Sequence, residues 1–288
     1  MRFIAKALPY FSLVKFSHSV FALPFAAIGF ALGLQAQHAM PVTLGIKVVL
    51  CMVFARNAAM AFNRWADKYI DAQNSRTSIR EIPAGIIKPS AAAWFTLLNS
   101  MAFIFTTYFI NSACFYLSFV ALAVVLGYSY TKRFTPLCHL VLGLGLSLAP
   151  IGAYIAVTGV FNFIPLMFSA IVLFWVCGFD IIYALQDIDF DRSQQLKSIP
   201  VLLGINGALT FARICHFMCA VLLIATGVYA GFAIWYWVGT ALFIALLIYQ
   251  HLLVKADDFS KINLAFFTTN GIGSLVFGFF VIIDISLS

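Results

Sequence analysis

Charged residues are scarce in this sequence of 288 residues. Asp, Glu, Lys and Arg make up 9% of it, whereas soluble proteins carry about 25%. Hydrophobic residues reach 63%, 31 residues are Phe, and the mean hydropathy is +1.01. A water-exposed globule of this composition would present apolar patches large enough to aggregate. The composition therefore excludes a soluble enzyme, a disordered chain and a secreted disulfide scaffold, and it predicts an integral membrane protein.

Cysteine motifs for metal binding or redox chemistry are also lacking. None of the six cysteines forms a CxxC pair, and most lie within apolar segments. The run Cys215-His216, followed by Cys219, could form a metal site, but helix packing is the favoured role. We therefore predict no disulfide and no zinc. The net charge of +7 predicts contact with the anionic head groups of membrane lipids rather than with nucleic acid.

Nine apolar segments are long enough to cross a bilayer, whose core of about 30 Å needs roughly 20 helical residues. They are residues 17–36, 43–66, 90–110, 113–130, 137–158, 163–185, 207–229, 232–252 and 266–286. The apolar run that follows Lys15 is too long for the core of a cleavable signal peptide. The sequence thus predicts an all-α integral membrane protein with nine transmembrane helices and a single domain over residues 1–288.

The basic residues alternate between the two sides of this predicted bundle. Fourteen basic residues lie before the first span or in every second loop, including the helix ends beside that loop. They are Arg2, Lys6, Lys15, Arg64, Lys68, Arg76, Arg80, Lys88, Lys132, Arg133, Arg192, Lys197, Lys255 and Lys261. The loops between them, near residues 37–42, 111, 161 and 230, contain none. The positive-inside rule then predicts an inner (cytoplasmic) membrane protein with its N-terminus in the cytoplasm and its C-terminus outside.

The first cluster of acidic residues follows the second predicted span. Asn63, Asp67 and Asp71 are spaced i, i+4 and i+8, so their side chains stack on one stripe of a helix. Two carboxylates at this spacing repel each other unless a cation lies between them. The alternative interpretation is a solvated helix end, with Lys68 and Arg64 as the partners of the acids.

The second cluster follows the sixth predicted span. Asp180, Asp187 and Asp191 have offsets of 7 and 4, which again predicts one stripe if the helix continues. Asp180 would lie one or two turns inside the bilayer, where an aspartate is unfavourable without a partner, so it indicates a polar cavity. Asp189 points elsewhere and is expected to be a solvated surface residue.

Two acidic stripes at the same membrane face can converge on shared divalent ions. All the candidate ligands are hard oxygens, and no His or Cys is expected nearby, which favours Mg²⁺ over zinc or copper. Magnesium held by a few carboxylates keeps open positions for substrate phosphates. A diphosphate is therefore the natural ligand, and the surrounding Arg and Lys side chains can stabilise its remaining charge.

At these residues the sequence resembles the UbiA superfamily of intramembrane prenyltransferases. The motifs that carry the resemblance are Asn63-x-x-x-Asp67-x-x-x-Asp71, Arg76-Thr77-x-x-Arg80-x-x-Pro83-x-Gly85, Asp180-x-x-Tyr183-Ala184-x-x-Asp187-x-x-x-Asp191 with the following Lys197-Ser198, and Tyr130-Thr131-Lys132-Arg133-Phe134-Thr135. The resemblance covers nearly the whole chain. It implies a helix bundle around a cytoplasm-facing, laterally open cavity. Phe side chains would line a tunnel for the polyprenyl chain, although the favoured role of each individual Phe is packing or contact with lipid.

Three features depart from the pattern of the family. Arg64 stands where many members have a second acid, Glu81 stands where many have proline, and residues 15–19 differ from the usual run that contains Lys-Pro. These features resemble a subgroup of 4-hydroxybenzoate polyprenyltransferase-like proteins, some of which are assigned to menaquinone synthesis. They bear on the identity of the aromatic acceptor.

The resemblance and the residues together predict the roles of a set of side chains. The expected ligands of Mg²⁺, which also act in catalysis, are Asn63, Asp67, Asp71, Asp187 and Asp191. The further residues expected to bind the substrates are Arg56, Lys68, Arg76, Arg80, Lys132, Arg133, Tyr183 and Lys197. Magnesium would assist the departure of the diphosphate, and the resulting allylic cation would attack a ring carbon next to a phenol oxygen.

Two roles stay open at this point. Asp180 either takes the ring proton or assists the phenol, or else it forms a structural hydrogen bond to Tyr183 or Arg56. The carboxylate of an aromatic acid needs a cation, for which Arg56 and Arg133 are the candidates. Arg56 could equally form a structural ion pair, and Arg213 carries the same ambiguity.

The sequence therefore predicts Mg²⁺-dependent transfer of a polyprenyl group from an isoprenoid diphosphate to an aromatic acid in quinone biosynthesis, with 4-hydroxybenzoate as the favoured acceptor. The alternative acceptor is a naphthoate on a route to menaquinone. Haem farnesylation and chlorophyll prenylation are less favoured. An ion-coupled membrane transporter is the alternative from a different class, because intramembrane acids also mark ion pathways.

Overall fold

The structure is a computed structural model of the chain, and it describes residues 9–14, 21–37 and 42–288. Helices and their connections make up this part of the chain, with one isolated β-bridge between Lys255 and Asp258. The helices are α2 (Leu23–Gln37), α3 (Val42–Ala66), α4 (Lys68–Gln73), α5 (Pro89–Tyr108), α6 (Ser112–Thr131), α7 (Cys138–Thr158), α8 (Phe163–Ala184), α9 (Ile188–Ser193), α10 (Ile199–Ala230), α11 (Ile234–Leu253) and α12 (Thr269–Leu287). A 3₁₀ turn, η2 (Leu185–Asp187), joins α8 to α9, and a π-helical turn, η3 (Leu264–Thr268), precedes α12.

The predicted all-α membrane class is confirmed, but the predicted number of spans is not. Among the described residues, seven helices are long and apolar enough to cross a membrane: α3, α6, α7, α8 together with α9, α10, α11 and α12 together with η3. Each of the nine predicted segments overlaps a helix, but α2 has only 15 residues and α5 is not among the seven.

One predicted boundary is wrong by eight residues. The seventh span was expected to begin at residue 207, whereas α10 begins at Ile199. The hydroxyl of Ser198 accepts a hydrogen bond from the backbone N–H of Val201, and Pro200 occupies the first turn, so this turn is capped in the usual way. A non-helical residue, Gly204, at a φ of 69°, separates this turn from the rest of α10.

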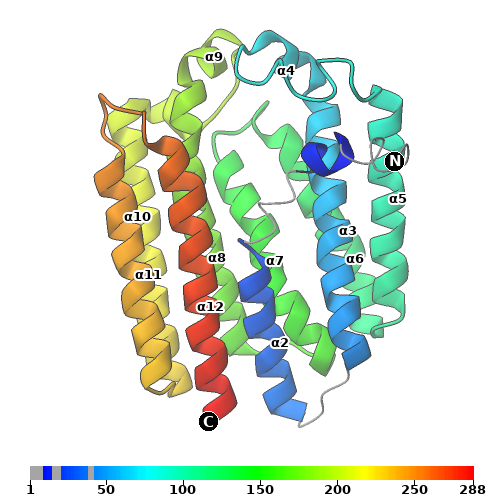
Figure 1. Cartoon of the computed structure of the whole chain (residues 1–288), viewed down its shortest axis with the longest axis vertical. Helices are drawn as coiled ribbons and strands as arrows, with labels where there is room; N and C mark the ends of the chain where they lie inside the picture. The colour runs from blue at the N-terminus through cyan, green and yellow to red at the C-terminus, as the bar shows by residue number, and fades with distance from the viewer. Residues whose placement is uncertain (1–8, 15–20, 38–41) are drawn as a thin grey trace.

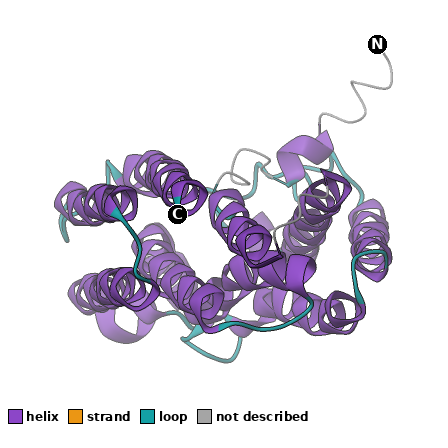
Figure 2. Ribbon diagram, turned by 90° about the horizontal axis from the view of Figure 1, so that it is seen from below, coloured by secondary structure: helices purple, strands orange, loops and turns teal. Residues whose placement is uncertain are grey.

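The helices stand side by side as a bundle with a short cap at one end. In Figure 1, α2 and α7 lie between a group formed by α8, α10, α11 and α12 and a second group formed by α3, α5 and α6, and α4 and α9 cover one end. Figure 2 shows the same helices end-on. The C-terminus lies at the opposite end from α4 and α9 (Figure 1). The predicted basic residues Arg2, Lys6 and Lys15 lie outside the described residues.

Large aromatic side chains fill the core between α2, α8, α11 and α12. Trp175, Phe25, Phe243 and Phe277 are fully or almost fully buried and are in ring contact with one another. The indole N–H of Trp175 donates to Asn270 Oδ1 at 2.9 Å, which satisfies a polar group inside this core. The abundance of Phe therefore serves helix packing as well as contact with the surroundings.

Candidate active site

A cavity of about 240 Å³ lies at the end of the bundle covered by α4 and α9. Its wall contains residues of α3, α4, α6, α7, α8 and α9 and of the loops beside them. All but three of the predicted site residues line it, namely Asn63, Asp67, Asp71, Arg76, Arg80, Lys132, Arg133, Asp180, Tyr183, Asp187 and Asp191. The tertiary structure thus brings both acidic clusters to one cavity.

The first acidic stripe crosses the junction between α3 and α4. Asp67 lies between the two helices, with φ −96° and ψ 9°. Helical hydrogen bonds nevertheless continue across it, since its N–H donates to the carbonyl of Asn63 at 3.0 Å and its own carbonyl accepts from Asp71 at 2.8 Å. The three side chains therefore keep the i, i+4, i+8 arrangement. The Asn63 amide also donates to Asp67 Oδ2 at 3.2 Å.

The second stripe is not a continuous α-helix. After Ala184 the chain passes through η2, and Asp187, with φ −106° and ψ 5°, precedes α9. Asp187 and Asp191 still reach the cavity. Asp189 is exposed, as its position on a different face predicted.

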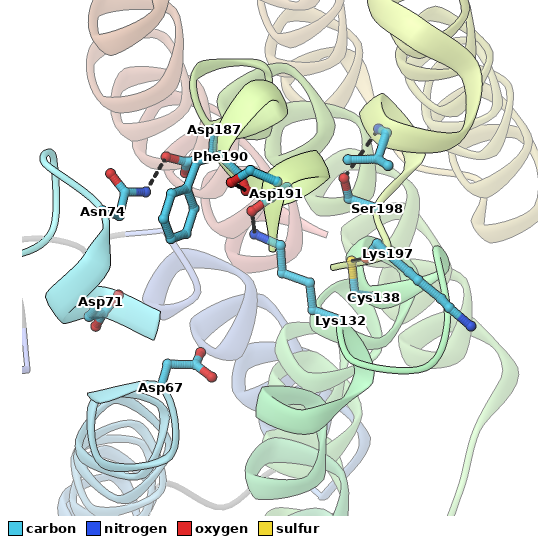
Figure 3. A network of polar contacts seen from close by, with 12 residues as sticks. Asp67, Asp71, Asn74, Lys132, Cys138, Asp187, Phe190, Asp191, Lys197 and Ser198 are labelled. Carbon is cyan, nitrogen blue, oxygen red and sulfur yellow. Dashed lines mark hydrogen bonds and ion pairs between the residues drawn. The ribbon is translucent and has the colours of Figure 1, made fainter. Parts of the chain in front are cut away.

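Every acidic side chain of the cavity is bonded to a basic side chain. The pairs are Asp67–Arg133 at 3.0 Å, Asp71–Arg80 at 2.6 Å, Asp180–His139 at 2.7 Å, Asp187–Arg76 at 2.5 Å and Asp191–Lys132 at 2.7 Å. Figure 3 shows Asp67 and Asp71 on one side of the cavity and the Lys132–Asp191 pair across from them. The partners of the first cluster are thus Arg133 and Arg80, not Lys68 and Arg64 as in the solvated-end interpretation.

These pairs shift the ionisation of groups outside the spanning helices. Burial raises the pKa of the Asp67 carboxyl, and the hydrogen bond from Arg133 only partly offsets this effect. Burial lowers the pKa of the Arg76 guanidinium, but its two hydrogen bonds to Asp187 outweigh burial, so its pKa is raised overall. Burial raises the pKa of the Asp187 carboxyl, but its contacts with Arg76 and Asn74 outweigh burial and lower this pKa overall, so both shifts favour the charged forms of the pair.

Among the cavity residues that sequence reasoning missed, Asn74, Cys138 and His139 bear most directly on its chemistry. Asn74 donates to Asp187 Oδ1 at 3.0 Å and accepts from the N–H of Arg76 at 2.9 Å, so it links the two acidic clusters (Figure 3). Cys138 and His139, at the start of α7, also line the cavity. The expectation that no His or Cys lies near the acids is therefore wrong, because α7 packs between α2 and α8 and brings these distant residues to the site.

The partner of Asp180 also differs from the expected ones. His139 Nδ1 lies 2.7 Å from Asp180 Oδ2, in place of the predicted bond to Tyr183 or Arg56. The Tyr183 hydroxyl accepts a long hydrogen bond from Arg76 at 3.4 Å, and its ring stacks on Phe266 with the ring centres 4.1 Å apart. Tyr183 therefore contacts both a charged residue of the cavity and the aromatic core of the bundle.

Arg56, Lys68 and Lys197 do not line the cavity. The Lys68 ammonium lies over the rings of Trp65 and Tyr69. Lys197 donates to the Phe134 carbonyl and points away from the acids (Figure 3). Arg56 donates to the Val14 carbonyl at 3.5 Å. Their predicted contacts with substrates stay predictions.

The donor set fits a hard divalent cation in its chemistry. Asp71 Oδ2 and Asp191 Oδ2 are buried and have no hydrogen-bond partner among the residues that the structure describes, and carboxylate oxygens are the ligands that Mg²⁺ prefers. Within the described part of the chain, however, no three acidic, His or Cys side chains are close enough together to hold a metal. Each carboxylate is bonded to its own base instead, so an ion would have to compete with Arg and Lys side chains for these oxygens.

The chain is similar in sequence to known prenyltransferases. A model of the UbiA prenyltransferase family matches residues 22–272. The 4-hydroxybenzoate octaprenyltransferase of Aeromonas salmonicida (strain A449) is 31% identical over 80% of this chain and 79% of its own length. That of Francisella tularensis subsp. novicida (strain U112) is 27% identical over 84% and 85%.

Solved structures of similar fold include UbiA homologues from two archaea. The apo structure of the homologue from Aeropyrum pernix K1 is 31% identical and has a TM-score of 0.84, over 93% of this chain and 98% of that one. The homologue from Archaeoglobus fulgidus, bound to GPP and Mg²⁺, shares the fold with a TM-score of 0.74 at 22% identity, over 96% and 99%. The predicted class of enzyme, a membrane-bound prenyltransferase, is confirmed. The chain therefore belongs to the UbiA prenyltransferase family.

Proposed function

We propose that this protein transfers a polyprenyl group from an isoprenoid diphosphate to an aromatic acid, with 4-hydroxybenzoate as the favoured acceptor. The observation that carries the proposal is that two acidic helix ends, α3–α4 and α8–α9, meet at one cavity together with four Arg and Lys side chains. Such a mixture of opposite charges matches a substrate that is bound as an anion together with divalent cations.

The diphosphate of the donor would bind among the bases of the cavity. Arg76, Arg80 and Lys132 each hold one carboxylate, and each retains further donor hydrogens. Exchange of partners would let the bases bind diphosphate oxygens while the acids bind cations. The diphosphate takes the electron pair of the C–O bond as it leaves, and these bases would stabilise its added charge. The GPP that is bound to the homologue from Archaeoglobus fulgidus supports an isoprenoid diphosphate as the donor.

The side chains that would hold the cations are Asn63, Asp67, Asp71, Asp187 and Asp191. The homologue from Archaeoglobus fulgidus binds Mg²⁺ in one structure and Cd²⁺ in another, which supports a divalent cation as the cofactor. When bound, Mg²⁺ supplies charge neutralisation for the leaving diphosphate. The hard oxygens of the carboxylates favour Mg²⁺ over softer metals.

The carboxylate of the aromatic acid would bind to an arginine. Arg133 lines the cavity, where it donates to Asp67 Oδ1 and to the carbonyl of Ala66. Arg56 is not part of the cavity wall, so Arg133 is the favoured anchor. The names of the two bacterial relatives favour 4-hydroxybenzoate, and a naphthoate acceptor on a route to menaquinone is the alternative.

The proposed location is the inner membrane, with the cavity and the N-terminus on the cytoplasmic side and the C-terminus outside. Both substrates can then reach the site: the soluble aromatic acid enters from the cytoplasm, and the polyprenyl chain stays among the lipid tails. Tyr183 and Phe266 lie between the charged cavity and the aromatic core. They would place the allylic carbon away from water, which otherwise captures the cation.

The test is a direct assay of the purified protein in nanodiscs. It receives Mg²⁺, prenyl diphosphates of several chain lengths and either 4-hydroxybenzoate or a dihydroxynaphthoate, and mass spectrometry identifies the products. We expect prenylated 4-hydroxybenzoate to form fastest. Faster prenylation of the naphthoate would establish the alternative acceptor. Ion or substrate flux into sealed vesicles, without any prenylated product, would instead establish a transporter and refute the proposal.

A further inference from the structure

His139 and Asp180 form a hydrogen-bonded pair in the wall of the cavity, apart from the acids that face the diphosphate. His139 is the second residue of α7, and Asp180 lies in the last two turns of α8. The distance between His139 Nδ1 and Asp180 Oδ2 is 2.7 Å. Both residues line the cavity. The four ion pairs of Asp67, Asp71, Asp187 and Asp191 make up the proposed diphosphate site, and none of them requires the pair of His139 and Asp180.

The close packing of α7 on α8 makes the pair possible. Gly143 lies one turn after His139, and a Cβ atom at this position would lie only 2.6 Å from the carbonyl oxygen of Leu173 on α8. Such a separation is too short for any residue larger than glycine without movement of the helices. Gly143 therefore lets α7 approach α8 closely enough for the imidazole to reach the carboxylate of Asp180.

The two partners differ in their exposure to the cavity. The Asp180 side chain is 22% exposed, whereas that of His139 is 4% exposed. Asp180 Oδ2 is held by the imidazole, so Oδ1 is the carboxylate oxygen left open to a substrate. The second ring nitrogen, His139 Nε2, is buried and has no hydrogen-bond partner among the described residues. His139 thus lies behind Asp180 and orients it.

Prenylation of an aromatic ring requires an acceptor for the ring proton. When the ring attacks the allylic carbon, a C–C bond forms and the diphosphate has left with the electron pair of the C–O bond. The ring carbon must then lose its hydrogen as a proton, so that the C–H electron pair restores aromaticity. A positioned carboxylate is a suitable general base for this step.

We propose that Asp180 Oδ1 accepts the ring proton of the aromatic acceptor and that His139 is the positioning residue that holds Asp180 for this step. The inference rests on the proposed function. The protonated Asp180 remains hydrogen-bonded to the imidazole until the proton passes to water in the cavity after the product leaves. The arrangement separates the two tasks of the site: acids and bases at α3–α4 and α8–α9 bind the diphosphate, and α7 with α8 removes the proton.

The test uses 4-hydroxybenzoate carrying deuterium at both ring positions next to the phenol oxygen. In the wild-type protein we expect no isotope effect on turnover, because proton loss follows the slow step. His139→Leu should lower kcat by about 100-fold, which is the low end for loss of general base catalysis, and a primary isotope effect should appear. His139→Asn keeps an N–H donor near the position of Nδ1 and should recover part of kcat. The KM for the prenyl diphosphate should stay unchanged in both variants.

His216→Gln is the matched control. His216 is a buried histidine that pairs with His251 and the carbonyl of Trp175 away from the cavity, so its replacement should leave the isotope effect absent. The isotope effect is a ratio, so it can be measured on whatever fraction of a variant folds. A wild-type rate in His139→Leu would overturn the inference, and so would a loss of rate that is equal in the Leu and Asn variants without any isotope effect. Absence of prenylated product from the wild-type protein would refute the proposed function instead.

Discussion

Replacement of Lys132 by Met is expected to destabilise the protein, because it leaves a buried carboxylate without its cation. The Asp191 side chain is 1% exposed, and the ammonium of Lys132 lies 2.7 Å from its Oδ1. Both carboxylate oxygens are buried, and neither has another hydrogen-bond partner among the described residues. The ion pair with Lys132 is therefore the main compensation for the burial of this charge.

The expected magnitude follows from the exposure of the two partners. Removal of one partner from a buried ion pair costs about 3–5 kcal/mol. The Lys132 side chain is 34% exposed, so water screens part of its interaction and the expected cost falls to the lower end of this range or just below it. We expect Lys132→Met to reduce the free energy of unfolding by about 2–3 kcal/mol. In the double variant with Asp191→Asn no charge is left unpaired, and the loss should fall to about 1 kcal/mol, the cost of one unsatisfied buried amide.

Equilibrium unfolding in mixed detergent micelles, with EDTA present, measures these free energies without competition from divalent ions. The single and double variants together give the coupling energy between Lys132 and Asp191. If the loss in the free energy of unfolding of the double variant equals the sum of the losses of the two single variants, the two side chains are not coupled and the reasoning is refuted. Addition of Mg²⁺ should then stabilise Lys132→Met more than the wild-type protein, because the released carboxylate of Asp191 can bind the ion.

Further predictions concern the cations and the helix contact. Asp67→Asn and Asp187→Asn should each lower turnover, measured as product formation, by at least about 100-fold. Membrane insertion, measured by fractionation, should be unchanged. Wild-type rates in both variants would refute the metal site. EDTA should abolish turnover of the wild-type protein, and excess Mg²⁺ should restore it; full activity after exhaustive chelation would contradict a divalent cofactor. Gly143→Ala places a Cβ 2.6 Å from the Leu173 carbonyl and should cost about 1–3 kcal/mol of stability. Gly152→Ala on the same helix meets no atom within 4 Å and should be neutral or slightly stabilising; equal thermal midpoints for the two variants would refute the steric argument.

Local spacing was sufficient to predict which acids line one cavity. The i, i+4 and i+8 positions of Asn63, Asp67 and Asp71 place them on one stripe wherever the chain is helical, and the hydrogen bonds across Asp67 preserve that stripe. The apolar runs likewise located the helices, because backbone N–H and C=O groups inside a bilayer cannot bond to water and a helix satisfies them within one segment. The prediction of a helix boundary was wrong where a capping residue set it, as Ser198 does before α10.

The pairing of charges could not be predicted in the same way. Arg76 is bonded to Asp187, which is 111 residues away, and Asn74 joins the same pair over 113 residues. No periodicity within one helix connects such residues. Arg56 and Lys68 have the right charge and lie near the acidic stripe in sequence, yet they are not part of the cavity wall.

The sequence by itself determined the environment, the helices and the two acidic stripes, because hydropathy and helical periodicity act over a few turns of one segment. Only the tertiary structure decided which base each acid binds and which residues complete the cavity. His139 illustrates the difference: it lies in an apolar run without any local polar pattern, and it reaches Asp180 only because Gly143 lets α7 pack closely on α8. Contacts between helices depend on side-chain volume across an interface, and this information is distributed over segments that are far apart in the chain.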